Sequence, residues 1–353
     1  MRRWGAKKIP GVELTVVDPN PRPIYSGMVP GFVAGEYTRD ELEIDLPDLC
    51  RRSGAVFVED RAKTIDAEGR GLRCEGKDLE WDVASLDIGS TVAGTHLPGV
   101  CAHAIASRPI PGLVGTVGQL VAKAKQKAPE PFVVHVVGGG AGGVELAFCL
   151  EARLRREGAT PEVVLATAEG ALLSGGSAAL RRAVVRSARR RGIRIVTHAQ
   201  VCGVEAGAIY LEEGRALVTD ATLWVTGPAA RPFGAESGLP VDDQGFVRID
   251  DTLRVVGHDD LFAVGDCASL SGMKRAGVYA VRSAPLLDHN LRARFDAGPD
   301  AELRRYRPQS DFLSLLNLGD GTAIGTKWAI AVTGRTVLRI KDRIDRSFME
   351  KYR

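Results

Sequence analysis

One stretch of the sequence constrains the fold more than any other: residues 132–150, FVVHVVGGGAGGVELAFCL. It begins with a short apolar run rich in β-branched residues, which is typical of a strand buried on both faces of a parallel sheet. Gly138, Gly140 and Gly143 follow at the spacing G-x-G-x-x-G, and an apolar segment of helix length comes next. A strand, a glycine turn and a helix in this order indicate a dinucleotide-binding site.

Each glycine has a separate physical role in such a turn. Gly138 permits the tight turn, Gly140 lets backbone N–H groups approach a pyrophosphate, and Gly143 lets the helix pack closely on the strand. The phosphates are expected at the helix N-terminus, where free N–H groups and the helix dipole favour negative charge. A purely structural turn is the alternative, but the correct flanks on both sides favour nucleotide binding.

Composition narrows the class of protein. A chain of 353 residues predicts about two domains. The net charge of +3 is too small to indicate a nucleic-acid partner. The six cysteines are widely scattered without a Cys-x-x-Cys pair, which predicts neither a metal site nor a dithiol centre and suits a reducing cytoplasm. No apolar run reaches the roughly 18 residues needed to span a bilayer.

A second nucleotide half is predicted at the start of the chain. Residues 12–17 have the pattern of a strand that ends in Asp18, and an acid there can bind a ribose hydroxyl. The alternative is that Asp18 starts the turn Asp-Pro-Asn-Pro. In a complete dinucleotide fold such an acid follows a glycine turn by about 20 residues. The residues before Asp18 contain no such turn, so we expect the first strand and glycine motif of this half to be missing.

Two further stretches are candidates for contact with a cofactor. Residues 21–31, PRPIYSGMVPG, form a proline- and glycine-rich loop with Tyr25, either a rigid turn or a cover over a cofactor ring. Residues 261–267, LFAVGDC, predict a short strand that delivers Gly265 and Asp266 at its carboxyl end, where ligands gather in open α/β sheets. A helix is predicted next, and its N-terminal dipole could stabilise an anionic ring.

The sequence fits either NADH or NADPH as the bound nucleotide. The strand predicted at 161–166 ends without the acid that favours NAD, because Ala166, Thr167 and Ala168 stand there and Glu169 comes late. The next helix, 178–191, is very basic; its arginines could meet a 2′-phosphate or form a solvated face. A helix is also predicted over 37–52.

The C-terminal segment has an amphipathic pattern. Residues 326–332 predict a strand, and the helix after it would carry Val337, Ile340, Ile344 and Phe348 on one stripe. Residues 337–353 hold six Lys or Arg against three Asp or Glu. Such a helix could lie on an anionic membrane surface, or pack against its own domain or a partner subunit. The chain is therefore expected in the cytoplasm, with attachment to the cytoplasmic face of a membrane left open.

The order of these motifs resembles a known group of enzymes. Six motifs follow one another along the chain: a strand ending in Asp18, the Tyr25 loop, LDIGS, a complete glycine turn followed by Glu145, LWVTG, and VGD before a helix. This order is similar to that of flavoprotein oxidoreductases of the pyridine nucleotide-disulfide superfamily, which have two dinucleotide-binding domains. Within them the chain looks most like the type II NADH:quinone oxidoreductase group. The stretches PIYSGMVPG, LNLGDGTAIG and KDRIDRSFMEKY resemble the branch associated with selenide, water dikinase.

The resemblance implies an α/β fold with two Rossmann-like domains, in which the NAD(P) domain is inserted into the FAD domain. Residues 1–107 and 251–310 would form the discontinuous FAD-binding domain, without its first strand and glycine motif. Residues 108–250 would form the NAD(P)H-binding domain. Residues 311–353 would form a small α+β C-terminal region with the amphipathic helix.

The resemblance also assigns roles to residues. Asp18 would hold the adenosine ribose of FAD, and Asp266 would hold the ribityl or phosphate region. Gly265 would permit close approach of the cofactor. Glu145, facing the nicotinamide, and Tyr25, near the flavin, are the catalytic candidates. The other implied cofactor-binding residues are Gly138, Gly139, Gly140 and Gly143 at the NAD(P)H pyrophosphate, Thr226 and Gly227 between the domains, and Ala276, Gly277 and Val278 beneath the isoalloxazine.

The implied reaction is hydride transfer from NAD(P)H to FAD, followed by re-oxidation by an acceptor such as a quinone. The flavin performs this chemistry, so no protein nucleophile is required. Two alternatives stay open: a flavin-poor nucleotide-binding or regulatory protein, and a soluble flavin enzyme of selenium or sulfur metabolism. A homodimer, or association with selenide, water dikinase, is the expected protein partnership.

Overall fold

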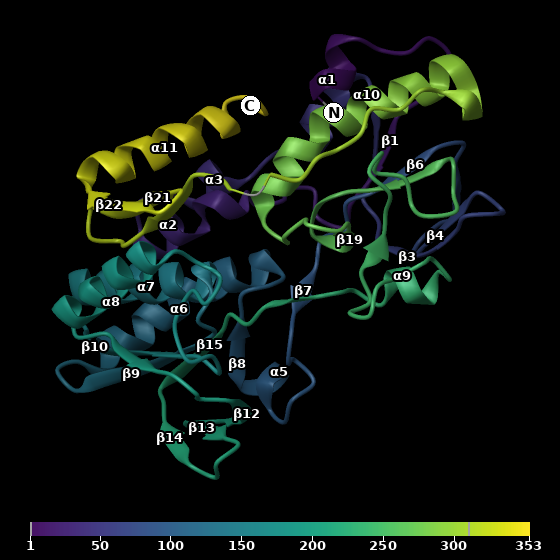
Figure 1. Ribbon diagram of the computed structural model, residues 1–353. Coiled ribbons are helices and arrows are strands. Elements are labelled where there is room, and N and C mark those ends of the chain that lie inside the picture. Colours follow the sequence, from purple (N-terminus) through teal and green to yellow (C-terminus); the bar gives the residue numbers. More distant parts are fainter. Residues whose placement is uncertain (1, 310) are drawn as a thin grey trace.

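A five-stranded parallel sheet holds the glycine-rich stretch. The computed structural model describes residues 2–309 and 311–353, and its fold is α/β, as predicted. The sheet order is β11 (Arg194–Val196), β10 (Thr160–Ala166), β9 (Pro131–Val137), β15 (Ala221–Trp224), β8 (Ala104–Ala106). One face is covered by α6 (Ile110–Lys127), α7 (Ala141–Arg156) and α8 (Ala178–Arg191) (Figure 1). The other carries α5 (Val100–His103) and the antiparallel sheet β12 (Val201–Glu205), β13 (Ala208–Leu211), β14 (Ala216–Val218).

Strand β9 is central and packs apolar side chains on both faces, with His135 as its buried polar residue. Phe132, Val134 and Val136 pack into the cluster beneath the helices, and Val137 packs into the cluster on the opposite face. The strand predicted at 132–137 and the helix predicted after it are confirmed, since β9 leads through the glycine turn directly into α7. We call residues 93–227 the first lobe.

The second lobe contains two separate parallel strand pairs. It comprises residues 2–24, 45–92 and 228–309. Strand β1 (Thr15–Val17) pairs with β2 (Val56–Val58), and β6 (Ala84–Leu86) pairs with β18 (Leu261–Ala263); no ladder joins the two pairs among the residues described. Its other elements are the sheet β3 (Ala62–Asp66), β4 (Gly71–Cys74), β5 (Leu79–Glu80), the pair β17 (Val247–Arg248) and β19 (Ala268–Ser269), and helices α1 (Arg2–Ala6), α4 (Leu46–Ser53), α9 (Phe233–Glu236), α10 (Gly277–Ala297), η2 (Gly265–Cys267) and η3 (Gly298–Asp300).

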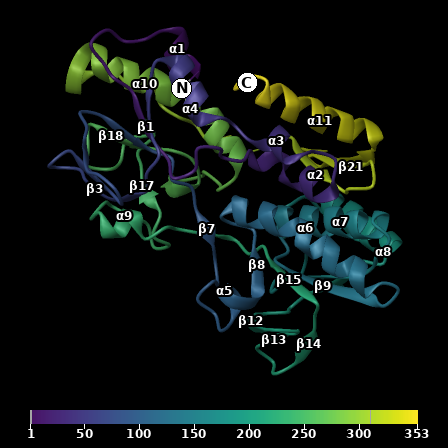
Figure 2. The same cartoon turned by 180° about the vertical axis from the view of Figure 1, so that it is seen from behind.

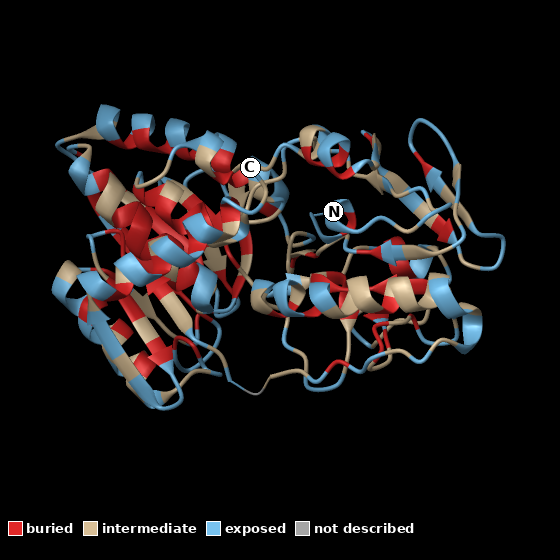
Figure 3. Cartoon of the chain, turned by 90° about the horizontal axis from the view of Figure 1, so that it is seen from above, coloured by how far each residue is buried: buried red, intermediate tan, exposed pale blue. Residues whose placement is uncertain are grey.

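Two extended segments run side by side where the lobes join. Strand β7 (Thr91–Val92) runs antiparallel to β16 (Pro228–Ala229) between them. Seen from above, buried residues fill the interior of each lobe, and this narrow connection lies between the two (Figure 3).

The C-terminal region packs on the helices of the first lobe. It consists of the hairpin sheet β20 (Ser314–Asn317), β21 (Ala323–Lys327), β22 (Ile330–Gly334) and helix α11 (Arg335–Met349). Residues 25–44 lie beside it, with η1 (Ser26–Met28), α2 (Val29–Ala34) and α3 (Arg39–Leu42), as both side views show (Figures 1 and 2). Met28, Val33 and Leu42 share the large core cluster with α7 and with Leu316 of β20. A segment from the start of the chain is thus built into the core of the first lobe.

Three sequence predictions of secondary structure were wrong in detail. The helix predicted over 37–52 is two helices, α3 and α4, because residues 43–45 are extended and Asp45 caps α4 by accepting from the Asp48 N–H at 2.9 Å. The strand predicted at 12–17 is confined to β1. The strand predicted at 326–332 is a hairpin that turns at Trp328, whose φ is +55°.

The apolar stripe predicted on the last helix is also divided. Val337 of α11 packs inward, but Ile340 and Ile344 are 46% and 47% exposed. Lys341 and Asp345 are buried in their place, at 9% and 4% exposure. Within residues 2–309 and 311–353, no helix combines the length and apolar character needed to cross a bilayer.

Candidate functional site

The glycine turn after β9 is shaped so that only one of its positions is open. A Cβ atom on Gly138, whose φ is +130°, would overlap the carbonyl oxygen of Val225, and one on Gly143 would overlap the carbonyl oxygen of Gly138. Gly140 differs, because a Cβ there would meet nothing within 4 Å. Gly140 is also the N-cap of α7 and provides no side-chain cap for the first N–H groups of that helix. The turn therefore fits a diphosphate at Gly140.

A hydroxyl group stands where an NAD-preferring site carries an acid. Thr167 directly follows β10 and is buried, and a Cβ on Gly139 would lie 2.6 Å from its Oγ1. Glu169 is two residues further on and exposed. Because no carboxylate lies beside the glycine turn at this position, the site has no fixed negative charge there to repel a 2′-phosphate.

Thr226 and Gly227 are fixed to the connection between the lobes. The Oγ1 atom of Thr226 donates to the carbonyl oxygen of Ala93 at 2.6 Å, and Ala93 N–H donates to the carbonyl of Gly227 at 2.9 Å. The indole N–H of Trp224 donates to the same carbonyl of Ala93 at 2.7 Å. These bonds hold the end of β15 against the segment that directly follows β7.

Asp18 lies at the carboxyl end of β1, as predicted from its position. Its Oδ1 atom accepts from the Asn20 N–H at 2.8 Å. This bond is the one expected if Asp18 starts the turn. That bond uses one of two carboxylate oxygens, so the ribose interpretation is compatible with it. Burial raises the pKa of Asp18, against the lowering effects of the Asn20 bond and of the Arg61 charge.

The LDIGS and VGD stretches meet at the carboxyl ends of β6 and β18. Gly265 has φ +70°, and a Cβ there would overlap the carboxylate of Asp87. Asp266 forms an ion pair with Arg108 at 2.9 Å and lies 3.5 Å from the Ser90 hydroxyl. Burial, and then the charge of Asp266, raise the pKa of Asp87 to about 6. Gly265 and Asp266 thus belong to a charged cluster at the edge of the second lobe.

The start of α10 meets the Tyr25 loop. Ala276 is the N-cap and makes no side-chain cap bond, and Gly277 and Val278 form the first turn. A Cβ on Gly277 would lie 3.8 Å from the Ser26 hydroxyl oxygen. The structure therefore brings Ala276, Gly277 and Val278 beside the loop that the sequence analysis associated with them.

Tyr25 itself turns toward the C-terminal helix. Its ring stacks on that of Phe348 with centroids 4.3 Å apart, and its hydroxyl donates to Asp345 at 3.3 Å. Burial, and then the Asp345 charge, raise the pKa of Tyr25. No sequence signal indicated this contact, since α11 lies at the other end of the chain.

Glu145 points under the C-terminal sheet. It lies in the second turn of α7, where its Oε1 accepts from the Asn317 N–H of β20 at 2.8 Å. Burial raises its pKa to about 7, although the charge of Lys341 opposes this shift. The Nζ atom of Lys341 donates to Asp345 at 2.9 Å and to the carbonyl of Gly27 at 2.8 Å.

We call Tyr25, Glu145, Lys341 and Asp345 the buried polar cluster. Sequence reasoning missed its two members on α11. The available signal was the i, i+4 spacing of Lys341 and Asp345, which puts both on the face that also carries Val337 and Met349. A lysine and an aspartate on the packed face of a helix are costly to bury unless they are paired, as these are.

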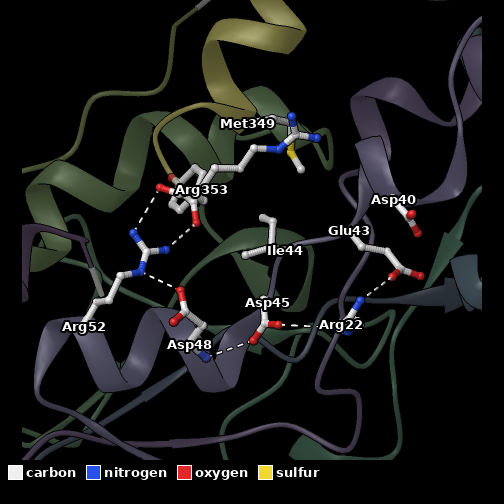
Figure 4. A pocket seen from close by; sticks show the side chains of 10 residues that line it. Arg22, Asp40, Glu43, Ile44, Asp45, Asp48, Arg52, Met349 and Arg353 are labelled. Carbon is white, nitrogen blue, oxygen red and sulfur yellow. Dashed lines mark hydrogen bonds and ion pairs between the residues drawn. The ribbon is translucent and has the colours of Figure 1, made fainter.

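A pocket of about 190 Å³ lies between residues 40–52 and the C-terminus (Figure 4). Four of its charged side chains form ion pairs: Arg22 lies 3.5 Å from Asp45, and Arg52 contacts Asp48 at 2.6 Å. Arg52 also donates to the carbonyl oxygens of Tyr352 and Arg353. The pocket contains none of the predicted site residues, and we assign no cofactor to it. Among the residues that the structure describes, no group of three His, Cys, Asp or Glu could hold a metal ion.

Comparisons with known proteins agree with this fold. The chain is 27% identical over 275 residues to the NADH dehydrogenase-like protein MT1860 of Mycobacterium tuberculosis, covering 76% of this chain and 68% of that protein. It is 25% identical over 264 residues to the demethylphylloquinone reductase NdbB of Synechocystis, covering 72% and 64%. Against a second NADH dehydrogenase-like protein of M. tuberculosis, Rv1812c, it spans 58% of the length of that relative.

The fold is shared with solved oxidoreductase structures. The sulfide:quinone oxidoreductase of Aquifex aeolicus superposes with a TM-score of 0.84 at 17% identity, covering 100% of this chain and 88% of that one. The model of one family, described as pyridine nucleotide-disulphide oxidoreductase, matches residues 6–284. The chain therefore belongs to the pyridine nucleotide-disulphide oxidoreductase family.

Proposed function

We propose that this chain is an FAD-dependent oxidoreductase that takes a hydride from NAD(P)H and passes electrons to an acceptor such as a quinone. The observation that carries the proposal is the glycine turn at α7, which is closed at Gly138 and Gly143 and open at Gly140. Relatives support the rest: one is named a demethylphylloquinone reductase and another an NAD(P)H-ubiquinone oxidoreductase of Arabidopsis thaliana.

The proposed division of the chain follows the two lobes in outline, but its boundaries differ from theirs, because residues 93–107 lie in the first lobe and residues 228–250 in the second. Residues 108–250 would bind NAD(P)H, residues 1–107 with 251–310 would bind FAD, and residues 311–353 would form the C-terminal region. Helix α2, which belongs to the FAD part, packs in the core of the first lobe, and this supports a tight contact between the FAD part and the NAD(P)H part. The upstream strand expected before residue 1 stays a prediction, and the coding DNA before the Met1 codon would test it.

Each part has residues that fit a dinucleotide. In the first lobe, Gly140 and the uncapped N–H groups of α7 would bind the NAD(P)H diphosphate. In the second, Asp18 would hold the FAD ribose and Asp266 the ribityl chain, while the open N-terminus of α10 would lie beneath the ring. When bound, the flavin supplies the hydride and electron chemistry, so the protein's contribution is alignment and electrostatics.

The buried polar cluster would supply protons to the acceptor. Reduction of a quinone to a quinol takes up two protons, and Glu145 has a pKa of about 7, suited to gaining and losing one near neutral pH. Burial lowers the pKa of Lys341, but the charges of Glu145 and Asp345 outweigh this effect and raise it. Tyr25 would position Asp345 and cover the flavin ring from the loop side.

The C-terminal region would also form the contact with a membrane surface. Trp328 and Ile330 at the hairpin are 71% and 65% exposed, and Ile340 and Ile344 of α11 are also exposed. Together with the excess of basic residues in 337–353, these apolar side chains are suited to an anionic bilayer surface. Homodimer formation and association with selenide, water dikinase stay predictions, tested by light scattering of the chain alone and mixed with the dikinase.

A steady-state assay tests the proposed function. The full chain, supplemented with FAD, should oxidise NADH or NADPH when a soluble quinone is supplied, and should not do so without FAD. Oxygen and selenium or sulfur compounds serve as alternative acceptors in the same assay. The proposal would be overturned if NADH and NADPH were oxidised with none of these acceptors. Oxidation only with a sulfur or selenium compound would make that compound, and not a quinone, the acceptor.

A further inference from the structure

The C-terminal sheet ends in an open edge, the outer side of β22. This strand pairs with β21 on one side, and no second strand or bridge meets it among the residues that the structure describes. It lies on the side of the C-terminal region that is remote from the second lobe (Figure 1). A strand in this position presents backbone N–H and C=O groups with which another extended segment can pair.

The free backbone groups of β22 are those of Ala331 and Thr333. The turn at Trp328 leaves Lys327 and Ile330 directly opposite each other, as in a hairpin with a two-residue turn. Such a pair exchanges both of its hydrogen bonds, and bonded pairs alternate with non-bonded ones along an antiparallel ladder. The N–H and C=O groups of Ala331 and Thr333 therefore point away from β21, and they bond to no other described part of the backbone.

The open edge lacks the features that usually protect such strands from pairing. Residues 328–334, WAIAVTG, contain no proline and no charged side chain. Ile330 and Val332 lie on one face of β22 and are 65% and 57% exposed. A bilayer does not suit this edge, because hydrocarbon offers no partner for free N–H and C=O groups. An extended peptide supplies those hydrogen bonds and also side chains that cover the two aliphatic residues.

Positive charge surrounds the open edge. Lys327 and Arg335 flank β22 in the sequence. Helix α8 packs against β22, and its Arg182 and Arg186 are exposed about one turn apart. None of these four cations has a carboxylate within 4.0 Å among the described residues. The charges are therefore available to a partner with acidic side chains.

We propose that the open edge of β22 binds an extended, acidic segment of a partner protein, which joins the three-stranded sheet as an additional strand. Backbone bonds to Ala331 and Thr333 set its register, and acidic residues at its ends meet Lys327, Arg335 and the arginines of α8. A second copy of this chain fits less well, because its own basic residues would then face these arginines.

Fluorescence anisotropy with labelled synthetic peptides tests this proposal on the full chain. The acidic probe alternates valine and threonine and carries glutamates at both ends. A second peptide has lysines in place of the glutamates. A third is the acidic probe with an N-methylated backbone, which removes its N–H donors but keeps every side chain and charge. We expect the acidic probe to bind, and each of the other two peptides to bind at least about tenfold more weakly.

Substitutions in the protein make the same distinctions. Thr333→Pro removes a free N–H and leaves the ladder to β21 intact, whereas Thr333→Ala keeps that N–H. We expect Thr333→Pro to weaken binding of the acidic probe at least about fivefold, and Thr333→Ala less than about twofold. Arg186→Glu should weaken it to a similar extent, whereas Arg73→Glu, at an exposed position of β4, should not. The N-methylated peptide tests the unaltered chain, so the proposal does not depend on the folding of any variant.

Several results would overturn the proposal. Equal binding of the acidic probe and its N-methylated form would leave only charge attraction. If vesicles containing anionic lipid sediment the chain and the acidic probe does not bind, the surface serves a membrane. If the probe does not bind and Thr333→Pro abolishes a dimer seen by light scattering, the edge serves a second copy. None of these results depends on oxidation of NAD(P)H, so they are independent of the proposed function.

Discussion

The substitution Glu145→Gln should make the protein more stable at alkaline pH. Glutamine has the shape of protonated glutamate and keeps an oxygen to accept the Asn317 N–H, but it carries no charge. Glu145 is half-buried beneath β20, and burial of its carboxyl raises its pKa to about 7 against an ordinary value of 4.5. Between pH 4.5 and about 7, the folded chain therefore keeps a proton on Glu145 that the unfolded chain has released.

The sign follows from this difference in bound protons. Because the folded pKa is the higher one, the contribution of Glu145 to stability is full below pH 4.5 and is lost as the pH rises through about 7. A difference of 7 minus 4.5 in pKa corresponds to about 3 kcal/mol of unfolding free energy. Glu145→Gln removes this loss, so the variant should equal the unaltered chain at low pH and exceed it by about 3 kcal/mol at pH about 8.

Calorimetry at two pH values measures the effect. A gain of about 3 kcal/mol should raise the transition temperature of this chain of 353 residues by roughly 4 °C at pH about 8, and the gain should vanish near pH 4.5. Glu157→Gln, at the end of the same helix, is the control: hydrogen bonding to Lys125 lowers the pKa of Glu157, so its loss should not stabilise the protein. An equal shift at both pH values, or a less stable Glu145→Gln at high pH, would refute the reasoning.

Three further predictions concern binding. Gly140→Ala should leave the thermal transition unchanged, because a Cβ meets nothing within 4 Å. The same change should weaken NADPH binding in a titration by about tenfold, because the methyl group would block the diphosphate. Unchanged NADPH binding would show that the diphosphate does not bind at this turn. Thr167→Glu should raise the kcat/KM ratio of NADH over NADPH at least about tenfold, by placing a carboxylate against the 2′-phosphate, and an unchanged ratio would contradict this. Ile344→Glu, at an exposed position of α11, should reduce sedimentation with vesicles containing anionic lipid, whereas Ser177→Ala should not.

Local patterns predicted the parts of the site that depend on neighbouring residues. The turn at Gly138, Gly140 and Gly143 was predictable because its geometry is set by a few adjacent backbone dihedrals and by the strand and helix on each side. The ends of β18 and β1 were predictable for the same reason, since an apolar run followed by glycine or an acid marks where a strand ends.

The contacts between distant segments could not be predicted in this way. Lys341 appears on an amphipathic helix whose aliphatic stripe suggested the buried face, yet Ile344 faces outward and Lys341 inward. The carboxylates of Asp345 and of Glu145, brought from α7, together with the carbonyl oxygen of Gly27, make that burial tolerable. The ion pair of Arg108 with Asp266 likewise joins two lobes, so no local spacing indicated it.

The central claim is that NAD(P)H and FAD meet in this chain, and single-turnover reduction of the flavin tests it most directly. The full chain loaded with FAD is mixed anaerobically with NADH or NADPH while the visible absorbance of the flavin is followed. The account predicts rapid loss of that absorbance and its return when a quinone is added. A flavin that stays bound and oxidised in the presence of both reduced nucleotides would contradict the account.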